Sequence, residues 1–170
     1  MVGCADSPIF LVGFMGCGKT TVGNQLAYLL GWDFVDSDQL VEQRSGRSIP
    51  EIFKLSGEAA FRSEEAAVLA TLVDRSRTVV ATGGGQFCVR ASRRLMQATG
   101  RTVWLDLDFE TIMLRVGEET ERPLWQTDDR TALRALFDRR RAVYALAEFK
   151  IAVENLGAED ISKRIRDHFR

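Results

Sequence analysis

The sequence predicts an α/β fold in which a parallel sheet of about five strands is covered by helices on both faces. Three observations lead to this prediction. Short apolar runs recur along the chain, stretches with helical periodicity separate nearly all of them, and a glycine-rich loop directly follows the first run. The runs are apolar throughout rather than alternating, which is typical of strands buried on both sides. They are Ile9–Val12, Phe34–Val35, Thr78–Ala81, Thr102–Leu107 and Phe149–Val153.

The first run leads into the sequence GFMGCGKT at 13–20, which has the spacing G-x-x-x-x-G-K-[ST] of a Walker A loop. Such a loop curls backbone N–H groups around a polyphosphate, places the Lys19 ammonium near the β and γ oxygens and offers the Thr20 hydroxyl to Mg²⁺. An amphipathic helix, Thr21 to Leu30, follows the loop, so nucleotide binding is favoured over a plain glycine turn. The predicted nucleotide-binding residues are Gly13, Gly16, Cys17, Gly18, Lys19, Thr20 and Thr21.

Two carboxylates follow the second run, in the sequence Asp36-Ser37-Asp38. Ligands of open parallel sheets bind at the carboxyl ends of the strands, so both side chains are expected near the phosphates. Asp36 would face the metal and Asp38 an attacking hydroxyl. The alternative is a solvated acidic turn in which Asp38 caps the next helix. Asp106, at the end of the fourth run, is the rival of Asp36 for the metal, and Asp36 is favoured because it lies beside Asp38.

Residues 39–75 depart from a simple strand–helix–strand rhythm, because Gly46, Pro50 and Gly57 break them into several helical segments. We interpret 39–65 as a substrate-binding region. The third run then delivers Thr82 and the triple glycine Gly83–Gly85. Glycine loses much backbone entropy on folding, so three in succession indicate close approach to a ligand, although a tight turn is the competing explanation.

The stretch 117–129 is polar, lacks helical periodicity and contains Arg122, and we interpret it as a mobile lid. A strong helical pattern resumes from Thr131 to Ala147, before the last strand. The whole chain, 1–170, is interpreted as a single domain, since an apolar content of 45% suffices for one core.

Charge and cysteine content argue against several functional classes. Lys and Arg number 23 against 24 Asp and Glu, giving a net charge of -1, so no general basic field would attract nucleic acid or a membrane. The 3 cysteines lie far apart and do not suggest a disulfide framework or a zinc site. Without a signal-peptide pattern or a membrane-spanning apolar run, the chain is expected to be a soluble cytoplasmic protein.

Taken together, these motifs resemble those of the shikimate kinase family over nearly the whole chain. The family pattern combines the Walker A loop with a D-[ST]-D motif, an E-x-x-F-R element, a T-G-G-G loop, an R-P-L lid element and an R-x-x-x-Y element. The corresponding residues here are Asp36–Asp38, Glu58–Arg62, Thr82–Gly85, Arg122–Leu124 and Arg140 with Tyr144. Two positions differ from the pattern: Glu148 stands at the family's alanine and Ala142 at a frequent proline.

The resemblance implies a three-layer P-loop kinase fold with a helical substrate-binding insertion and a mobile lid. It also implies ATP-dependent phosphorylation of the 3-hydroxyl of shikimate, a step of chorismate and aromatic amino acid biosynthesis, by a monomer that uses Mg²⁺. In that scheme Asp38 is the base, Asp36 and Thr20 hold Mg²⁺, and Arg122 contacts the transferred phosphoryl group. The implied shikimate-binding residues are Asp38, Arg62, Gly83, Gly84, Gly85 and Arg140, and the implied adenine wall is Arg115 with the loop at 155–158.

Two other functions remain open from the residues alone. A gluconate or nucleoside monophosphate kinase would share the phosphate loop but would need other acceptor contacts. A related fold that binds a nucleotide or a partner without catalysis would be expected to lack Lys19, Asp38 or a substrate arginine. Arg62 and Arg140 would each be an ordinary surface charge if the resemblance did not single them out.

Overall fold

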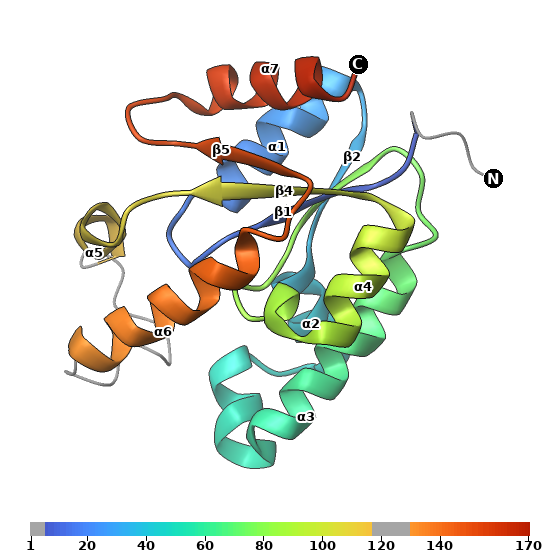
Figure 1. Cartoon of the computed structure of the whole chain (residues 1–170). Helices are drawn as coiled ribbons and strands as arrows, with labels where there is room; N and C mark the ends of the chain where they lie inside the picture. The colour runs from blue at the N-terminus through green and yellow to red at the C-terminus, as the bar shows by residue number, and fades with distance from the viewer. Residues whose placement is uncertain (1–5, 117–129) are drawn as a thin grey trace.

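A five-stranded sheet forms the centre of the computed structural model, which describes residues 6–116 and 130–170. The strand order is β2-β3-β1-β4-β5, and every neighbouring pair is parallel (Figure 1). The predicted α/β class with a five-stranded parallel sheet is therefore confirmed. The strands are β1 Ile9–Val12, β2 Asp33–Asp36, β3 Thr78–Ala81, β4 Arg101–Asp106 and β5 Phe149–Ala152.

Helices cover both faces of the sheet and make the fold three-layered. Figure 1 shows α1 and α7 on one side of the sheet, and α3, α4 and α6 on the other. The helices are α1 Lys19–Leu30, α2 Ser37–Ser45, α3 Ile49–Leu72, α4 Arg90–Thr99, α5 Phe109–Val116, α6 Arg130–Tyr144 and α7 Ala158–His168, with a 3₁₀ turn, η1, at Gln86–Cys88.

Burial separates the inner strands from the outer ones. All residues of β1 and β3 are buried, and so is β4 after its first residue. The edge strands β2 and β5 are only partly buried. The expectation that every strand is covered on both faces is therefore wrong for the two edges, where a strand has one neighbour instead of two.

The segment between β2 and β3 is built from two helices. Gly46 has φ 66 and ends α2, and Gly57 has φ 79 and interrupts the helical backbone of α3, as their positions in the sequence suggested. Pro50 has a different role, because it stands in the first turn of α3, where its missing N–H costs nothing. Ser48 and Glu51 form a capping box around that first turn. Pro50 therefore helps α3 to begin rather than breaking it.

The predicted lid, 117–129, lies outside the described residues, and so does Arg122. Among the helices of residues 6–116 and 130–170, none combines the length and the apolar character that crossing a membrane requires.

Candidate active site

The loop after β1 is folded as a phosphate-binding loop. Gly18 has φ 93 and stands at the N-cap of α1, a backbone conformation that favours glycine. The first-turn N–H groups and the positive dipole end of α1 then face the space in front of the loop. The Lys19 ammonium lies over this loop and donates hydrogen bonds of 2.9 Å to the carbonyls of Gly13 and Phe14. These two hydrogen bonds hold the Lys19 side chain against the loop.

Close packing explains the first glycine of the loop. A Cβ at Gly13, where φ is 147, would lie 2.8 Å from the Leu105 carbonyl and 2.9 Å from the Cys17 sulfur. The Cys17 thiol is itself 2% exposed and points beneath the loop, toward Trp104 and Tyr144. The side chain of Cys17 therefore supports the loop from below.

Asp36 connects the second strand to both neighbouring helices. Its Oδ2 accepts a hydrogen bond of 2.9 Å from the Thr20 hydroxyl, and its Oδ1 accepts bonds of 3.0 and 3.4 Å from the N–H groups of Asp38 and Gln39. Asp36, not Asp38, is therefore the residue that caps α2, contrary to the acidic-turn alternative. Asp36 is the last residue of β2, and its β-region dihedrals permit capping.

A cavity of about 420 Å³ lies in front of the phosphate loop. It brings together residues from the ends of β1, β2 and β3, as the carboxyl ends of parallel strands should. Arg115, an exposed residue of α5, also reaches it. Of the predicted site residues, the cavity is lined by Gly16, Gly18, Lys19, Thr20, Thr21, Asp36, Asp38, Gly84 and Arg115.

The first and the third glycine of the triple run lie closer to charged side chains than a Cβ atom would allow, whereas the middle one has ordinary spacing. A Cβ at Gly83 would lie 2.6 Å from Asp38 Oδ1 and 2.8 Å from Glu65 Oε1. A Cβ at Gly85 would lie 2.7 Å from the nearest nitrogen of Arg62. At Gly83 and Gly85 the close approach is made by side chains of the protein, and the expected approach of a ligand stays a prediction.

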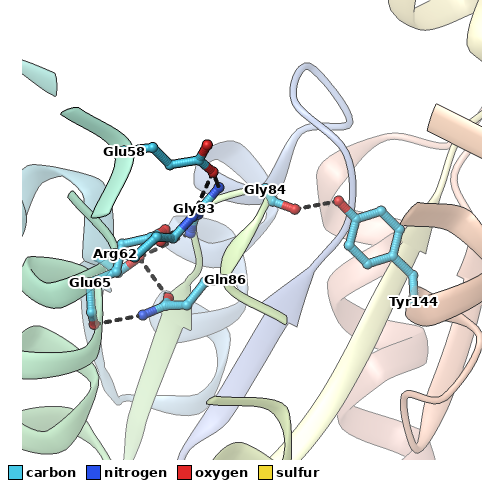
Figure 2. Close-up of polar contacts among 8 residues, drawn as sticks. Glu58, Arg62, Glu65, Gly83, Gly84, Gln86 and Tyr144 are labelled. Atoms are coloured by element: carbon cyan, nitrogen blue, oxygen red, sulfur yellow. Dashed lines mark hydrogen bonds and ion pairs between the residues drawn. The ribbon is translucent and has the colours of Figure 1, made fainter. Parts of the chain in front are cut away.

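Arg62 is held by two carboxylates on its own helix, as Figure 2 shows. Its guanidinium donates to Glu65 Oε2 at 2.5 Å and to Glu58 Oε1 at 3.1 Å. Burial lowers the pKa of Arg62, but Glu65 and Glu58 raise it by more. Burial raises the pKa of Glu65, and the nearby Asp38 carboxylate adds to this, against the opposing effect of Arg62. The Glu65 side chain is only 4% exposed, so a buried carboxylate holds the Arg62 guanidinium in place.

The arginine run of α6 is divided among different partners. Arg140 is half-buried, lies over the Phe14 ring at 5.7 Å and places a nitrogen 3.6 Å from the Cβ position of Gly84. Arg141 instead pairs with Asp106 at 3.0 Å. Arg139 is exposed. Of the three, Arg140 is therefore the one beside the glycine loop.

Asp106 is a structural residue in this fold. Its carboxylate is 7% exposed and accepts ion pairs from Arg141 of α6 and from Lys150 of β5, at 3.0 and 2.8 Å. It is absent from the residues that line the phosphate cavity, whereas Asp36 is among them. The choice of Asp36 over Asp106 for the metal stays a prediction.

Sequence reasoning missed two buried polar residues that support the glycine loop. The Ser37 hydroxyl accepts a hydrogen bond of 3.0 Å from the Gly83 N–H, and the Gln86 amide donates one of 2.9 Å to the Glu65 carbonyl. Both residues are at most 2% exposed. Their positions in the sequence could have indicated this role, because Ser37 lies within the D-S-D motif and Gln86 directly follows the glycines.

Comparison with known proteins places these features in a family. The family model described as "Shikimate kinase" matches residues 15–170. The chain is 46% identical to the shikimate kinase of Halorhodospira halophila, covering 94% of this chain and 91% of that one, and 46% identical to that of Synechococcus elongatus, covering 86% and 77%. A solved shikimate kinase from Acinetobacter baumannii, in complex with shikimate, superposes with a TM-score of 0.92 at 37% identity and covers 97% of this chain and 93% of that chain.

Proposed function

The chain belongs to the shikimate kinase family, and we propose that it transfers the γ-phosphoryl group of ATP to the 3-hydroxyl of shikimate. The products are shikimate 3-phosphate and ADP, in a step of chorismate and aromatic amino acid biosynthesis. The observation that carries the proposal is the shared cavity in which the phosphate loop, Asp38 and Gly84 meet. That arrangement fits a phosphoryl donor and an acceptor alcohol side by side.

The donor half of the site would hold ATP and Mg²⁺. The loop amides and Lys19 suit the phosphates, and Arg115 at the rim suits the adenine. The oxygens of Thr20 and Asp36 lie 2.9 Å apart, and an all-oxygen pair of this kind fits the ligand preference of Mg²⁺. Bound there, Mg²⁺ would neutralise charge on the phosphate oxygens.

The acceptor half would hold shikimate by its carboxylate and its hydroxyl. Arg62 and Arg140 flank the glycine loop, and a planar guanidinium can grip a carboxylate through two parallel hydrogen bonds. The backbone of Gly83, Gly84 and Gly85 would line the ring. Asp38, which lines the cavity, would face the 3-hydroxyl.

In the transfer, the 3-oxygen of shikimate forms a bond to the γ-phosphorus while the bond from that phosphorus to the β,γ-bridging oxygen breaks. The hydroxyl proton passes to the Asp38 carboxylate, and the leaving oxygen remains on ADP. Lys19 would stabilise the charge that develops on the β and γ oxygens. Arg122, in the predicted lid at 117–129, would add a second positive charge and help to exclude water.

The remaining parts of the proposal concern the state of the protein in the cell. We expect a monomer in the cytoplasm that needs no nucleic acid, membrane or protein partner for this reaction. The net charge of -1 fits the absence of a polyanionic partner.

A coupled assay of ADP release tests the proposed function. Mg-ATP would be supplied with shikimate, with gluconate or with mixed nucleoside monophosphates, and Asp38→Asn would be compared with Asp33→Asn, which changes an exposed residue of the same region. We expect turnover with shikimate only, lost in Asp38→Asn and kept in Asp33→Asn. Turnover only with another acceptor would contradict the substrate, and ATP binding without any turnover would favour a non-catalytic protein.

A further inference from the structure

One buried hydrogen bond connects α6 to the glycine loop. The Tyr144 hydroxyl donates to the carbonyl oxygen of Gly84, which is 60 residues away in the chain (Figure 2). Tyr144 is 1% exposed, and its ring packs against Trp104 with centroids 6.2 Å apart. Burial raises the pKa of Tyr144, so the phenol keeps its proton and acts as a donor. The catalytic scheme given above makes no use of this contact.

The geometry of a peptide unit gives the contact a consequence. The Gly84 carbonyl and the Gly85 N–H belong to one planar trans peptide, so they point in opposite directions. Tyr144 lies on the α6 side of the loop. The Gly85 N–H must therefore point away from α6, and Figure 2 shows Arg62 on the side of the loop opposite to Tyr144. The nearest Arg62 nitrogen lies 2.7 Å from the Cβ position of Gly85.

The neighbouring polar groups of the loop are already occupied. The Gly83 N–H donates to Ser37, the Gly83 carbonyl accepts from the Gln86 N–H at 3.1 Å, and the Gly85 carbonyl accepts from the Cys88 N–H at 3.0 Å. Within residues 6–116 and 130–170, the N–H groups of Gly84 and Gly85 donate no hydrogen bond. Both N–H groups are thus available to a ligand, and Gly84 lines the cavity.

We propose that Tyr144 is a positioning residue: its hydroxyl fixes the Gly84–Gly85 peptide so that the Gly85 N–H faces the carboxylate of the acceptor, next to Arg62. Arg140 lies one helical turn before Tyr144, so the two residues share a face of α6. This face of α6 therefore contributes the Arg140 guanidinium directly and, through the hydrogen bond from Tyr144 to the Gly84 carbonyl, orients the Gly85 N–H. Both groups would bind the same carboxylate. The inference rests on the proposed function, because it takes shikimate as the acceptor.

The variant Tyr144→Phe tests the inference because it removes one oxygen and keeps the ring. The chain offers a matched control in Tyr28→Phe, since Tyr28 is 84% exposed on α1. We expect the KM for shikimate to rise roughly tenfold in Tyr144→Phe, with kcat and the Kd for ATP within about twofold of wild type. A purely structural role would weaken ATP binding and kcat as well. An unchanged KM for shikimate, or equal losses for both substrates, would overturn the inference.

Nuclear magnetic resonance of ¹⁵N-glycine-labelled protein provides a readout besides activity. In the wild type, we expect shikimate to move the Gly85 amide resonance, and the Tyr144 hydroxyl proton to exchange slowly with water. In Tyr144→Phe the Gly85 shift should shrink. These wild-type measurements decide the matter even if Tyr144→Phe is too unstable for kinetics: a Gly85 resonance that does not move, or a rapidly exchanging hydroxyl, overturns the inference.

Different results would overturn the proposed function and the role of Tyr144. Wild type and Tyr28→Phe without shikimate-dependent ADP release would overturn the proposed function, and this inference with it. Wild type and Tyr28→Phe active, with Tyr144→Phe indistinguishable from them, would overturn the inference alone.

Discussion

The Thr20 hydroxyl donates a hydrogen bond of 2.9 Å to Asp36 Oδ2, joining the first turn of α1 to the end of β2. The other oxygen of Asp36 caps α2 through the N–H groups of Asp38 and Gln39. The two oxygens of one carboxylate therefore have separate tasks. One fixes the helix that carries Asp38, and the other faces the site proposed for Mg²⁺.

This division predicts the effect of Asp36→Asn. An amide oxygen can still cap α2, but the negative charge beside Thr20 is gone, so the Mg²⁺ needed for half-maximal activity should rise about 10- to 100-fold. The measurement is ADP release as a function of free Mg²⁺. Asp33→Asn, at the exposed start of the same strand, should leave the curve in place. An unchanged curve in Asp36→Asn would remove Asp36 from the metal site.

Asp106→Asn should behave in the opposite way. Asp106 is buried and pairs with Arg141 and Lys150, whose side chains are 47% and 52% exposed, so solvent screens part of the interaction. We expect the free energy of unfolding to fall by about 1–3 kcal/mol, with the Mg²⁺ curve unshifted. Urea denaturation measures the first quantity. Asp138→Asn, which breaks an exposed pair with Arg134, should cost less than about 1 kcal/mol.

Gly83→Ala tests the close packing of the glycine loop. The new Cβ would lie 2.6 Å from Asp38 Oδ1 and 2.8 Å from Glu65 Oε1, so one carboxylate must move. We expect kcat/KM for shikimate to fall at least about tenfold, which corresponds to about 1.4 kcal/mol. The control is Gly157→Ala, because no atom lies within 4 Å of the Cβ position at Gly157. Wild-type activity in Gly83→Ala would mean that neither carboxylate needs its present position.

The raised pKa of Glu65 predicts a pH dependence of stability. Burial holds the pKa of Glu65 above its ordinary value of 4.5. As pH rises above 4.5, the unfolded chain loses this proton before the folded protein does, so the contribution of Glu65 to stability falls until pH passes the folded-state pKa. Relative to Glu65→Gln, the wild type should therefore lose unfolding free energy with increasing pH in that window. Urea titrations from about pH 4 to 8 measure this difference.

The neighbouring residue provides a control for this prediction. Glu64 pairs with Arg44 and is more exposed than Glu65. Glu64→Gln makes the same exchange at this more exposed position, so it measures how much of any pH dependence comes from the exchange itself. A pH-independent difference between wild type and Glu65→Gln would contradict the raised pKa.

Local sequence patterns were sufficient to predict the central part of the fold. The phosphate loop and the inner strands have signatures within a few residues, namely glycine spacing and unbroken apolar runs. The same patterns predicted the edge strands less well. β2 extends to Asp33 and Asp36 because both residues pair with β3, and an apolar pattern does not include such carboxylates. Pro50 was misread for a similar reason, since a proline starts or stops a helix depending on its neighbours.

The contacts that complete the site could not be predicted from the sequence. Tyr144 bonds to Gly84 over 60 residues, and Asp106 meets Arg141 over 35. Nothing in the residues around either pair indicates its partner, because the contact is made by how α6 packs against the sheet. The role of Asp106 stayed open for this reason, and Tyr144 stood only as part of a spacing pattern.

The arginine run of α6 has a consequence for aligning and redesigning proteins of this kind. Consecutive helical residues point roughly 100° apart, so Arg140 faces the glycine loop while Arg141 faces Asp106. Inserting or deleting one residue within α6 before the run would turn each arginine by roughly 100°, into the direction of its neighbour. The three adjacent arginines are therefore not interchangeable, because the helix gives each of them different surroundings. A sequence alignment shifted by one position would assign the role of one arginine to another.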